Sequence, residues 1–177
     1  MRGKILLLFL LSFIVLSSLA FSVDIDECYG FSENSTLTQN IYGDNTCMIA
    51  WADDITLDCD GYKITYGQGA SGTRYGVDYT DHSNVNVQNC VFEAGPSGNA
   101  ALYGLRGGGH VENVSIIQPN AASGIALSHG HFTLENITIN STSTTTSEYA
   151  VVLMSGFSDF IANNLRIYTA GKNYLGI

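Results

Sequence analysis

The sequence predicts an all-β protein wound into a solenoid of about five turns with three strands per turn. Two observations carry this prediction. An asparagine flanked on both sides by alternating apolar residues occurs four times, at intervals of 24, 23 and 28 residues. The segments of variable length all fall at one place in this repeat. The four copies are Val85–Phe92, Gly109–Ile116, Phe132–Ile139 and Phe160–Ile167.

The alternation on each side of the asparagine predicts a strand, a bend at the asparagine and a second strand. Stacking would place these asparagines in a column, where each side-chain amide donates to one neighbour and accepts from the other. Asn113 and Asn136 also begin glycosylation sequons, and we expect the ladder to bury both side chains. The ladder residues are Asn89, Asn113, Asn136 and Asn164.

A short strand precedes each asparagine segment and completes the turn. A divergent earlier turn covers Ile55–Ile64, where Asp58 to Gly61 replace the asparagine bend, and Leu37–Ile41 is a partial first turn. The expected first strands are Cys47–Ile49, Val77–Tyr79, Leu102–Leu105, Ile125–Leu127 and Val151–Met154.

Loops rich in Gly, Ser, Thr and Asn follow the third strand of each turn, so that insertions project from one side of the stack. They are Gly67–Arg74, Ala94–Ala100, Gln118–Ser123, Asn140–Glu148 and Ala170–Asn173.

The N-terminus resembles a secretory signal peptide covering residues 1–20. Arg2 and Lys4 precede an apolar run, and Ser18 to Ala20 form a small-residue cleavage site. The alternative is an uncleaved membrane anchor, which would be the chain's only membrane contact. Residues 21–46 then form an N-terminal segment with the partial first turn, and residues 47–177 form the solenoid domain.

The chain is acidic, with 16 Asp and Glu against 7 Lys and Arg and a net charge of −9. If the signal peptide, with Arg2 and Lys4, is removed, 16 acidic and 5 basic residues remain, and the net charge is about −11. A nucleic-acid partner is therefore not expected, because binding to phosphates requires clustered Lys and Arg.

Four cysteines in an exported chain allow two disulfides in three pairings. Cys59 and Cys90 lie at the bend of successive turns, where stacked strands are about 4.8 Å apart and within disulfide reach. We therefore expect Cys59–Cys90 and Cys28–Cys47. The alternative is that Cys47, Cys59 and Cys90 are buried free thiols.

These repeats resemble those of right-handed parallel β-helix proteins, the superfamily that includes pectate lyases and polygalacturonases. In that fold an asparagine ladder marks the bend between the second and third strands. The stretches from Ile55 to Ile64 and from Asn84 to Cys90 are also similar to repeats of secreted archaeal and bacterial surface proteins. The resemblance covers residues 37–168 and implies a right-handed parallel β-helix, but it implies little about activity.

In polysaccharide-cleaving relatives, catalytic groups would lie on the outward face of the first strands. Only Asp78 ionises among the outward residues expected here, whereas a glycosidase needs two carboxylates. We therefore expect a secreted or cell-surface interaction module, with a glycan or polysaccharide as candidate ligand. The alternative is a polysaccharide lyase or glycoside hydrolase whose catalytic turns lie outside this chain. The outward residues are expected to be Met48, Asp78, Tyr103 or Gly104, Ala126 and Val152.

Aromatic rings on the loop side favour a shallow glycan groove, because sugars stack on such rings. The other interpretation is that the rings cover the edge of the stack. The candidate carbohydrate-binding residues are Tyr66, Tyr75, Asp78 and Tyr149, and Tyr29 lies on the same side.

The sequence also contains two candidate cation sites. A column of imidazoles with a carboxylate at the corner between the first two strands would suit Zn or Cu, although solvated polar corners explain the same residues. Ca²⁺ is the candidate cofactor for Asp53, Asp54, Asp58, Asp60, Asp78 and Asp81. The candidate metal ligands in the column are His82, His110, His129, His131 and Asp81.

Residues 168–177 resemble the start of another turn rather than a cap. A bare terminal turn leaves apolar surface and unpaired strand edges. This predicts either a longer protein of which this chain is the N-terminal part, or end-to-end self-association of copies.

Overall fold

The structure is a computed structural model that describes residues 22–69, 72–119, 123–142 and 159–169, and the backbone of residues 151–154. This part of the chain contains sixteen β-strands and no helix. It also contains no helix long and apolar enough to cross a membrane. The expected signal peptide lies outside the described residues.

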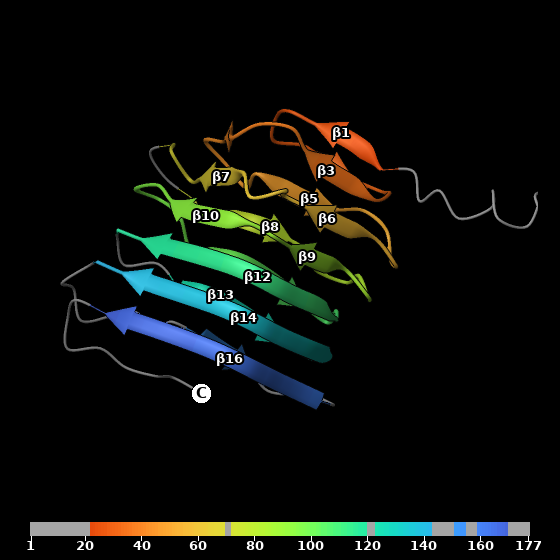
Figure 1. Cartoon of the computed structure of the whole chain (residues 1–177), viewed down its shortest axis with the longest axis vertical. Coiled ribbons are helices and arrows are strands. Elements are labelled where there is room, and N and C mark those ends of the chain that lie inside the picture. The colour runs from red at the N-terminus through yellow and green to blue at the C-terminus, as the bar shows by residue number, and fades with distance from the viewer. Residues whose placement is uncertain (1–21, 70–71, 120–122, 143–150, 155–158, 170–177) are drawn as a thin grey trace, which may run out of the picture.

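The strands form two sheets in which every pairing is parallel (Figure 1). The six-stranded sheet consists, in order, of β2 (Gly30–Phe31), β5 (Met48–Ala50), β8 (Tyr75–Asp78), β11 (Ala100–Leu105), β13 (Ser123–Ser128) and β15 (Val151–Met154). The ten-stranded sheet consists of β1 (Val23–Ile25), β3 (Ser35–Leu37), β4 (Ile41–Tyr42), β6 (Thr56–Asp58), β7 (Lys63–Tyr66), β9 (Asn86–Gln88), β10 (Val91–Ala94), β12 (Gly109–Gln118), β14 (His131–Ser141) and β16 (Asp159–Thr169).

The chain alternates between the two sheets, and each circuit adds one strand to the six-stranded sheet. The six strands from β2 to β15 therefore delimit five turns. The predicted fold class, a parallel β-solenoid of about five turns, is confirmed. In the later turns the expected second and third strands join into one, so that β12, β14 and β16 run through the asparagine bend without a break.

The core is a stack of apolar rows that run along the solenoid axis. Leu57, Val87, Val111 and Leu134 lie in register in successive turns, and each is almost fully buried. A second row on the third strands contains Ile41, Ile64, Phe92, Ile116 and Ile139. A third row on the six-stranded sheet contains Met48, Val77, Leu102 and Ile125. This burial supplies the main driving force for stacking the turns.

The asparagine ladder is confirmed. Asn89, Asn113, Asn136 and Asn164 all have φ of 54–55°, in the left-handed region that Asn tolerates better than most residues. Asn164 donates to the Oδ1 of Asn136 at 2.7 Å, Asn136 to Asn113 at 3.2 Å, and Asn113 to Asn89 at 3.3 Å.

The ladder lies on the outside of the solenoid, so the expectation that Asn113 and Asn136 are buried is wrong: both side chains are exposed. The left-handed residue interrupts the strand alternation. Glu112 and Asn113 consequently both point outward, while Val111 and Val114 on either side both point into the core.

Both predicted disulfides are present. Cys28–Cys47 and Cys59–Cys90 have Cα–Cα distances of 4.5 and 4.8 Å, and the described residues include no free cysteine. The second bridge joins the bends of two successive turns, as the repeat register predicts. Disulfides are typical of extracytoplasmic proteins, and this location suits the chain.

The last described strand is less covered than the strand before it. Phe160, Leu165 and Ile167 of β16 are only partly buried. Their partners in the preceding turn, Phe132, Ile137 and Ile139, are buried. End-to-end self-association of copies stays a prediction.

We predict that Asn113→Ala lowers the free energy of unfolding by about 2 kcal/mol, because it removes ladder hydrogen bonds and forces a Cβ-bearing residue without a polar side chain into the left-handed region. Asn113→Gly removes the amide but adopts this backbone freely, so it should lower the stability by about half as much. Urea titrations followed by circular dichroism would measure both. Equal losses in the two variants would show that the backbone requirement contributes nothing.

Candidate functional site

The outer face of the six-stranded sheet carries a row of residues in register: Gly30, Ile49, Asp78, Tyr103 and Ala126. Asp78, Tyr103 and Ala126 lie where the sequence predicted them. Met48 does not. It is fully buried, and Ile49 takes the outward position, 38% exposed. The reason is that Met48 pairs with the inward Val77, which fixes the phase of β5.

An exposed aromatic pair covers the start of this face. The Trp51 ring lies against the backbone of Gly30, so close that a Cβ on Gly30 would stand 2.2 Å from it. Trp51 also contacts Tyr29 edge-on, with ring centroids 5.6 Å apart and an interplanar angle of 68°. Both rings remain largely open to solvent, Trp51 at 55% and Tyr29 at 56% exposure.

A second aromatic pair lies two turns further along. Tyr75 and Tyr103 stack face to face, with centroids 3.9 Å apart and planes within 3° of parallel. Burial, and then the contact with Tyr103, raise the pKa of Tyr75, so its hydroxyl stays protonated under ordinary conditions. We call Tyr29, Ile49, Trp51, Tyr75, Asp78 and Tyr103 together the aromatic platform.

Asp78 lies between the two aromatic pairs, in register with Ile49 on one side and Tyr103 on the other. Its Oδ1 accepts hydrogen bonds from the backbone N–H of Thr80 at 3.0 Å and from the Thr80 hydroxyl at 2.7 Å. These bonds fix the orientation of the carboxylate. Its Oδ2 makes no hydrogen bond within the part of the chain that the structure describes, and it can accept one from a ligand.

Two other predicted carbohydrate-binding residues, Tyr66 and Tyr149, are not part of the aromatic platform. Tyr66 is fully buried in the core, and it cannot stack on a ligand. Its inward position follows from β7, where Ile64 and Tyr66 share the core face. Tyr149 lies outside the described residues. Trp51 is not among the residues predicted from the sequence. Because Ile49 points outward and side chains alternate along a strand, Trp51, two residues later, points outward as well.

The corner between the first and second strands does not assemble the predicted metal ligands. His82 pairs with Asp53 at 3.2 Å and His131 with Asp159 at 3.0 Å. His110 lies 3.5 Å from Glu112, and His129 contacts the hydroxyl of Ser128 at 2.6 Å. Asp81 forms a two-point ion pair with Arg106, at 2.7 and 3.0 Å. No group of three metal-binding side chains occurs among the described residues.

Backbone geometry accounts for several of these corner residues. Asp54, Asp81, Arg106 and His129 occupy the corner of four successive turns, and all have φ between 53° and 64°. They form a second column of left-handed residues, at a different corner of the turn from the asparagine column. Aspartate tolerates this conformation, so the carboxylates of Asp54 and Asp81 suit the bend itself.

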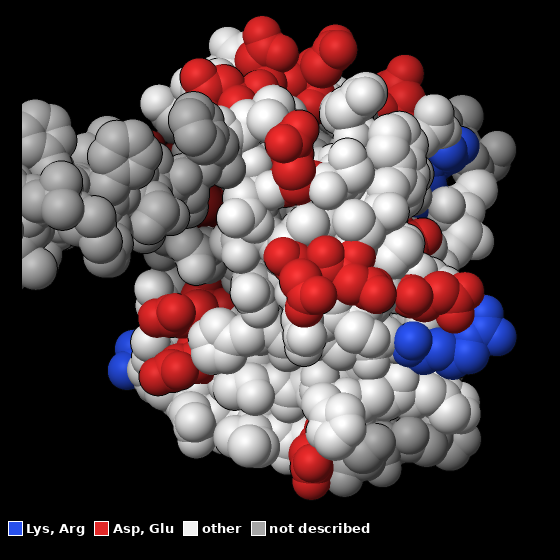
Figure 2. All heavy atoms as spheres, turned by 90° about the vertical axis from the view of Figure 1, so that its right-hand side faces the viewer, with Lys and Arg blue, Asp and Glu red and all other residues white. Residues whose placement is uncertain are grey.

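The aspartates predicted to bind Ca²⁺ are likewise dispersed. Asp53 accepts a hydrogen bond from the backbone of Ser83, and Asp54 accepts one from the side chain of Asn84. The Ser83 and His82 hydrogen bonds to Asp53 lower the pKa of its carboxyl. Figure 2, which looks onto this side of the molecule, shows the carboxylates in several separate groups and the basic side chains at the edges.

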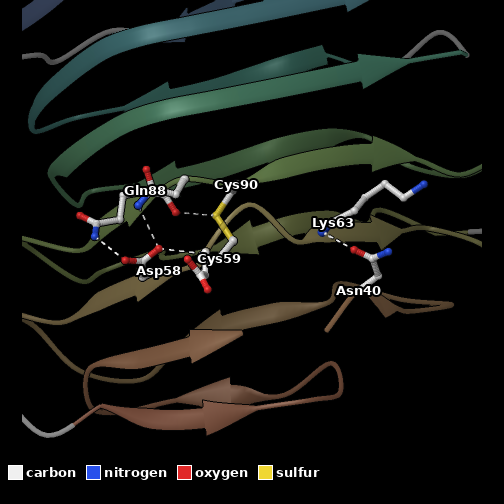
Figure 3. The surroundings of a disulfide bond; sticks show 8 residues. Asn40, Asp58, Cys59, Lys63, Gln88 and Cys90 are labelled. Atoms are coloured by element: carbon white, nitrogen blue, oxygen red, sulfur yellow. Dashed lines mark hydrogen bonds between the residues drawn. A yellow bond between two sulfur atoms is a disulfide. The ribbon is translucent and has the colours of Figure 1, made fainter. Parts of the chain in front are cut away.

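Asp58 ends the asparagine ladder next to the Cys59–Cys90 disulfide (Figure 3). Its Oδ1 accepts from Asn89 at 3.0 Å and from the N–H of Asp60 at 2.9 Å, and its Oδ2 accepts from Gln88 at 2.7 Å. An ionised carboxylate accepts hydrogen bonds but cannot donate them. The series of side-chain hydrogen bonds that begins at Asn164 therefore ends at the negatively charged Asp58. Partial burial opposes ionisation, but these three hydrogen bonds outweigh it and lower the pKa of Asp58.

Comparison with protein-family models, curated proteins and solved structures finds no match.

We predict that Asp58→Asn destabilises the protein at neutral pH and not in acid. The folded state lowers the pKa of Asp58, so the carboxylate stabilises the fold above its unfolded pKa of about 3.9, and this contribution is lost as the pH falls through the lower folded value. The melting temperatures of wild type and variant should therefore differ at about pH 7 and converge towards about pH 2. Asp26→Asn, at an exposed carboxylate, should leave the melting temperature unchanged at both values. A constant gap across the titration would contradict a role for the charge.

Proposed function

We propose that this chain is a secreted or cell-surface module that binds carbohydrate on the aromatic platform. The observation that carries the proposal is the Tyr29–Trp51 pair, which holds two large rings more than half exposed on the outer face of a regular sheet. A contiguous exposed apolar patch on a soluble protein commonly marks a binding site.

The chemistry of the platform suits a sugar. The C–H faces of a pyranose are apolar and pack on aromatic rings, while its hydroxyls need acceptors. The two ring pairs supply the apolar surface, and the free Oδ2 of Asp78 supplies an acceptor between them. A binding surface that combines apolar area with a few oriented polar groups is the usual composition of a ligand site.

The platform continues into two shallow hollows at the N-terminal end of the solenoid. They have volumes of about 200 and 210 Å³, and Tyr29 lines both. The platform residues lie in or next to four successive strands of the six-stranded sheet, β2, β5, β8 and β11, so the proposed binding surface extends over several turns. Such a surface fits an extended oligosaccharide better than a single enclosed small molecule.

The resemblance to the pectate-lyase superfamily supports the location of the site, because that resemblance implies substrate binding along the face of the first strands. The alternative is a lyase or hydrolase whose catalytic turns lie outside this chain. Asp78 is the only Asp or Glu in the strands of the six-stranded sheet, whereas hydrolysis needs a pair of carboxylates about 5–10 Å apart. This composition favours binding.

We predict that Trp51→Ala weakens binding to a soluble oligosaccharide at least tenfold, because it removes the largest ring of the platform. Isothermal titration calorimetry with cello-oligosaccharide and chito-oligosaccharide would measure the dissociation constants. Tyr42→Ala is the matched control, since Tyr42 is 65% exposed but lies on β4 in the other sheet. Equal weakening in both variants, or no binding of any oligosaccharide by the wild type, would contradict the proposal. Release of unsaturated or reducing sugar would favour the enzyme instead.

A further inference from the structure

We infer that the aromatic platform selects glycans without acidic groups, either neutral or amine-bearing, and rejects polyuronates. This inference rests on the proposed carbohydrate binding and adds the chemical class of the ligand. The platform combines ring surfaces with carboxylates, and no basic side chain lies in the strands of the six-stranded sheet.

Carboxylates lie at one end of the platform and at its middle. Asp24, Asp26 and Glu27 line the hollow beside Tyr29. Glu33 lines the second hollow, and Asp78 lies between the two ring pairs. A glycan chain lying along the rings would therefore face negative charge at several of its sugar units.

The two arginines next to these strands are already engaged, and no lysine flanks them. The guanidinium of Arg74, the residue before Tyr75, donates to the side chain of Asn45. Arg106, the residue after Leu105, uses its Nε and Nη2 on the two oxygens of Asp81. To pair with a uronate, Arg106 would have to break two charge-assisted hydrogen bonds, which are about twice as strong as neutral ones.

Electrostatic repulsion separates the two classes of glycan. Two like charges a few ångströms apart repel each other, and they do so more strongly near a protein surface than in bulk water, because the effective dielectric constant is lower there. A polyuronate carries one carboxylate on every sugar, so this repulsion recurs along the chain. A neutral glycan avoids it, and a protonated amine reverses its sign.

Hydrogen-bond chemistry points the same way. The free Oδ2 of Asp78 is an acceptor, and its partner must donate. Sugar hydroxyls, which all three classes of glycan carry, can donate to it, and an ammonium group donates with a favourable charge. A uronate carboxylate only accepts, so it cannot pair with Asp78. Because Thr80 holds the other oxygen of Asp78 with two hydrogen bonds, the carboxylate cannot easily turn away from the ligand.

The test is calorimetry of the full mature chain against three oligosaccharides of equal length: chitosan oligomer, cello-oligosaccharide and oligogalacturonate. The titrations are run at a mildly acidic pH, at which the amines of chitosan are protonated, and at low and high NaCl. We expect the chitosan oligomer to bind most tightly and oligogalacturonate at least tenfold more weakly than cello-oligosaccharide. High salt should weaken chitosan binding and narrow these differences, since exposed charges are screened.

The variant Asp78→Asn removes the negative charge at the centre of the platform but keeps nearly the same side-chain shape. It should reduce the preference for chitosan over cello-oligosaccharide several-fold while cello-oligosaccharide binding persists. Glu135→Gln, which removes a carboxylate from β14 in the other sheet, is the matched control and should leave all three affinities unchanged.

The outcomes distinguish this inference from the proposed function. Preferential binding of oligogalacturonate would overturn the charge selectivity and leave carbohydrate binding intact. Equal selectivity in wild type and Asp78→Asn would overturn the role of Asp78. If none of the three oligosaccharides binds, the proposed function itself is wrong.

Discussion

A left-handed asparagine at the same position in four successive turns governs the shape of this solenoid. At the asparagine column, a φ of 54–55° turns the strand without ending its pairing, so β12, β14 and β16 continue through the bend. The same residue places two consecutive side chains outward and lets the flanking apolar residues both point inward. The left-handed backbone at the asparagine therefore accounts both for the apolar rows of the core and for the asparagine ladder on the outside. The second left-handed column, from Asp54 to His129, lies at the corner that leads out of the six-stranded sheet, where one strand ends before the next begins.

The constant turn geometry also creates the candidate binding surface. Because successive turns stack in register, residues 25 to 29 positions apart in the chain, such as Ile49, Asp78 and Tyr103, become direct neighbours on the outer face. No local segment of the sequence contains the platform. It exists because six parallel strands present the same face, and because Gly30 leaves room for the Trp51 ring against the backbone.

The acidic residues divide between structural and exposed roles. Asp58 terminates the ladder, Asp53 joins two turns through His82, and Asp81 holds Arg106. These carboxylates have partners within the fold. Asp78 differs, since Thr80 uses only its Oδ1, and its Oδ2 has no hydrogen-bond partner among the described residues. The net negative charge therefore does not by itself indicate cation binding; the position of each carboxylate decides its role.

The sequence alone determined the repeat, the parallel solenoid, the ladder asparagines and the pairing of Cys59 with Cys90. Each of these depends on spacing along the chain, and stacking converts a constant spacing directly into a neighbour relation. Only the tertiary structure decided which way particular side chains face. It placed Met48 and Tyr66 in the core, put Asn113 and Asn136 on the surface, and gave each corner histidine a separate partner. These choices depend on a shift of one residue in strand phase or on a few ångströms between side chains. Composition and periodicity do not specify either, because both phases of a short apolar strand have nearly the same pattern.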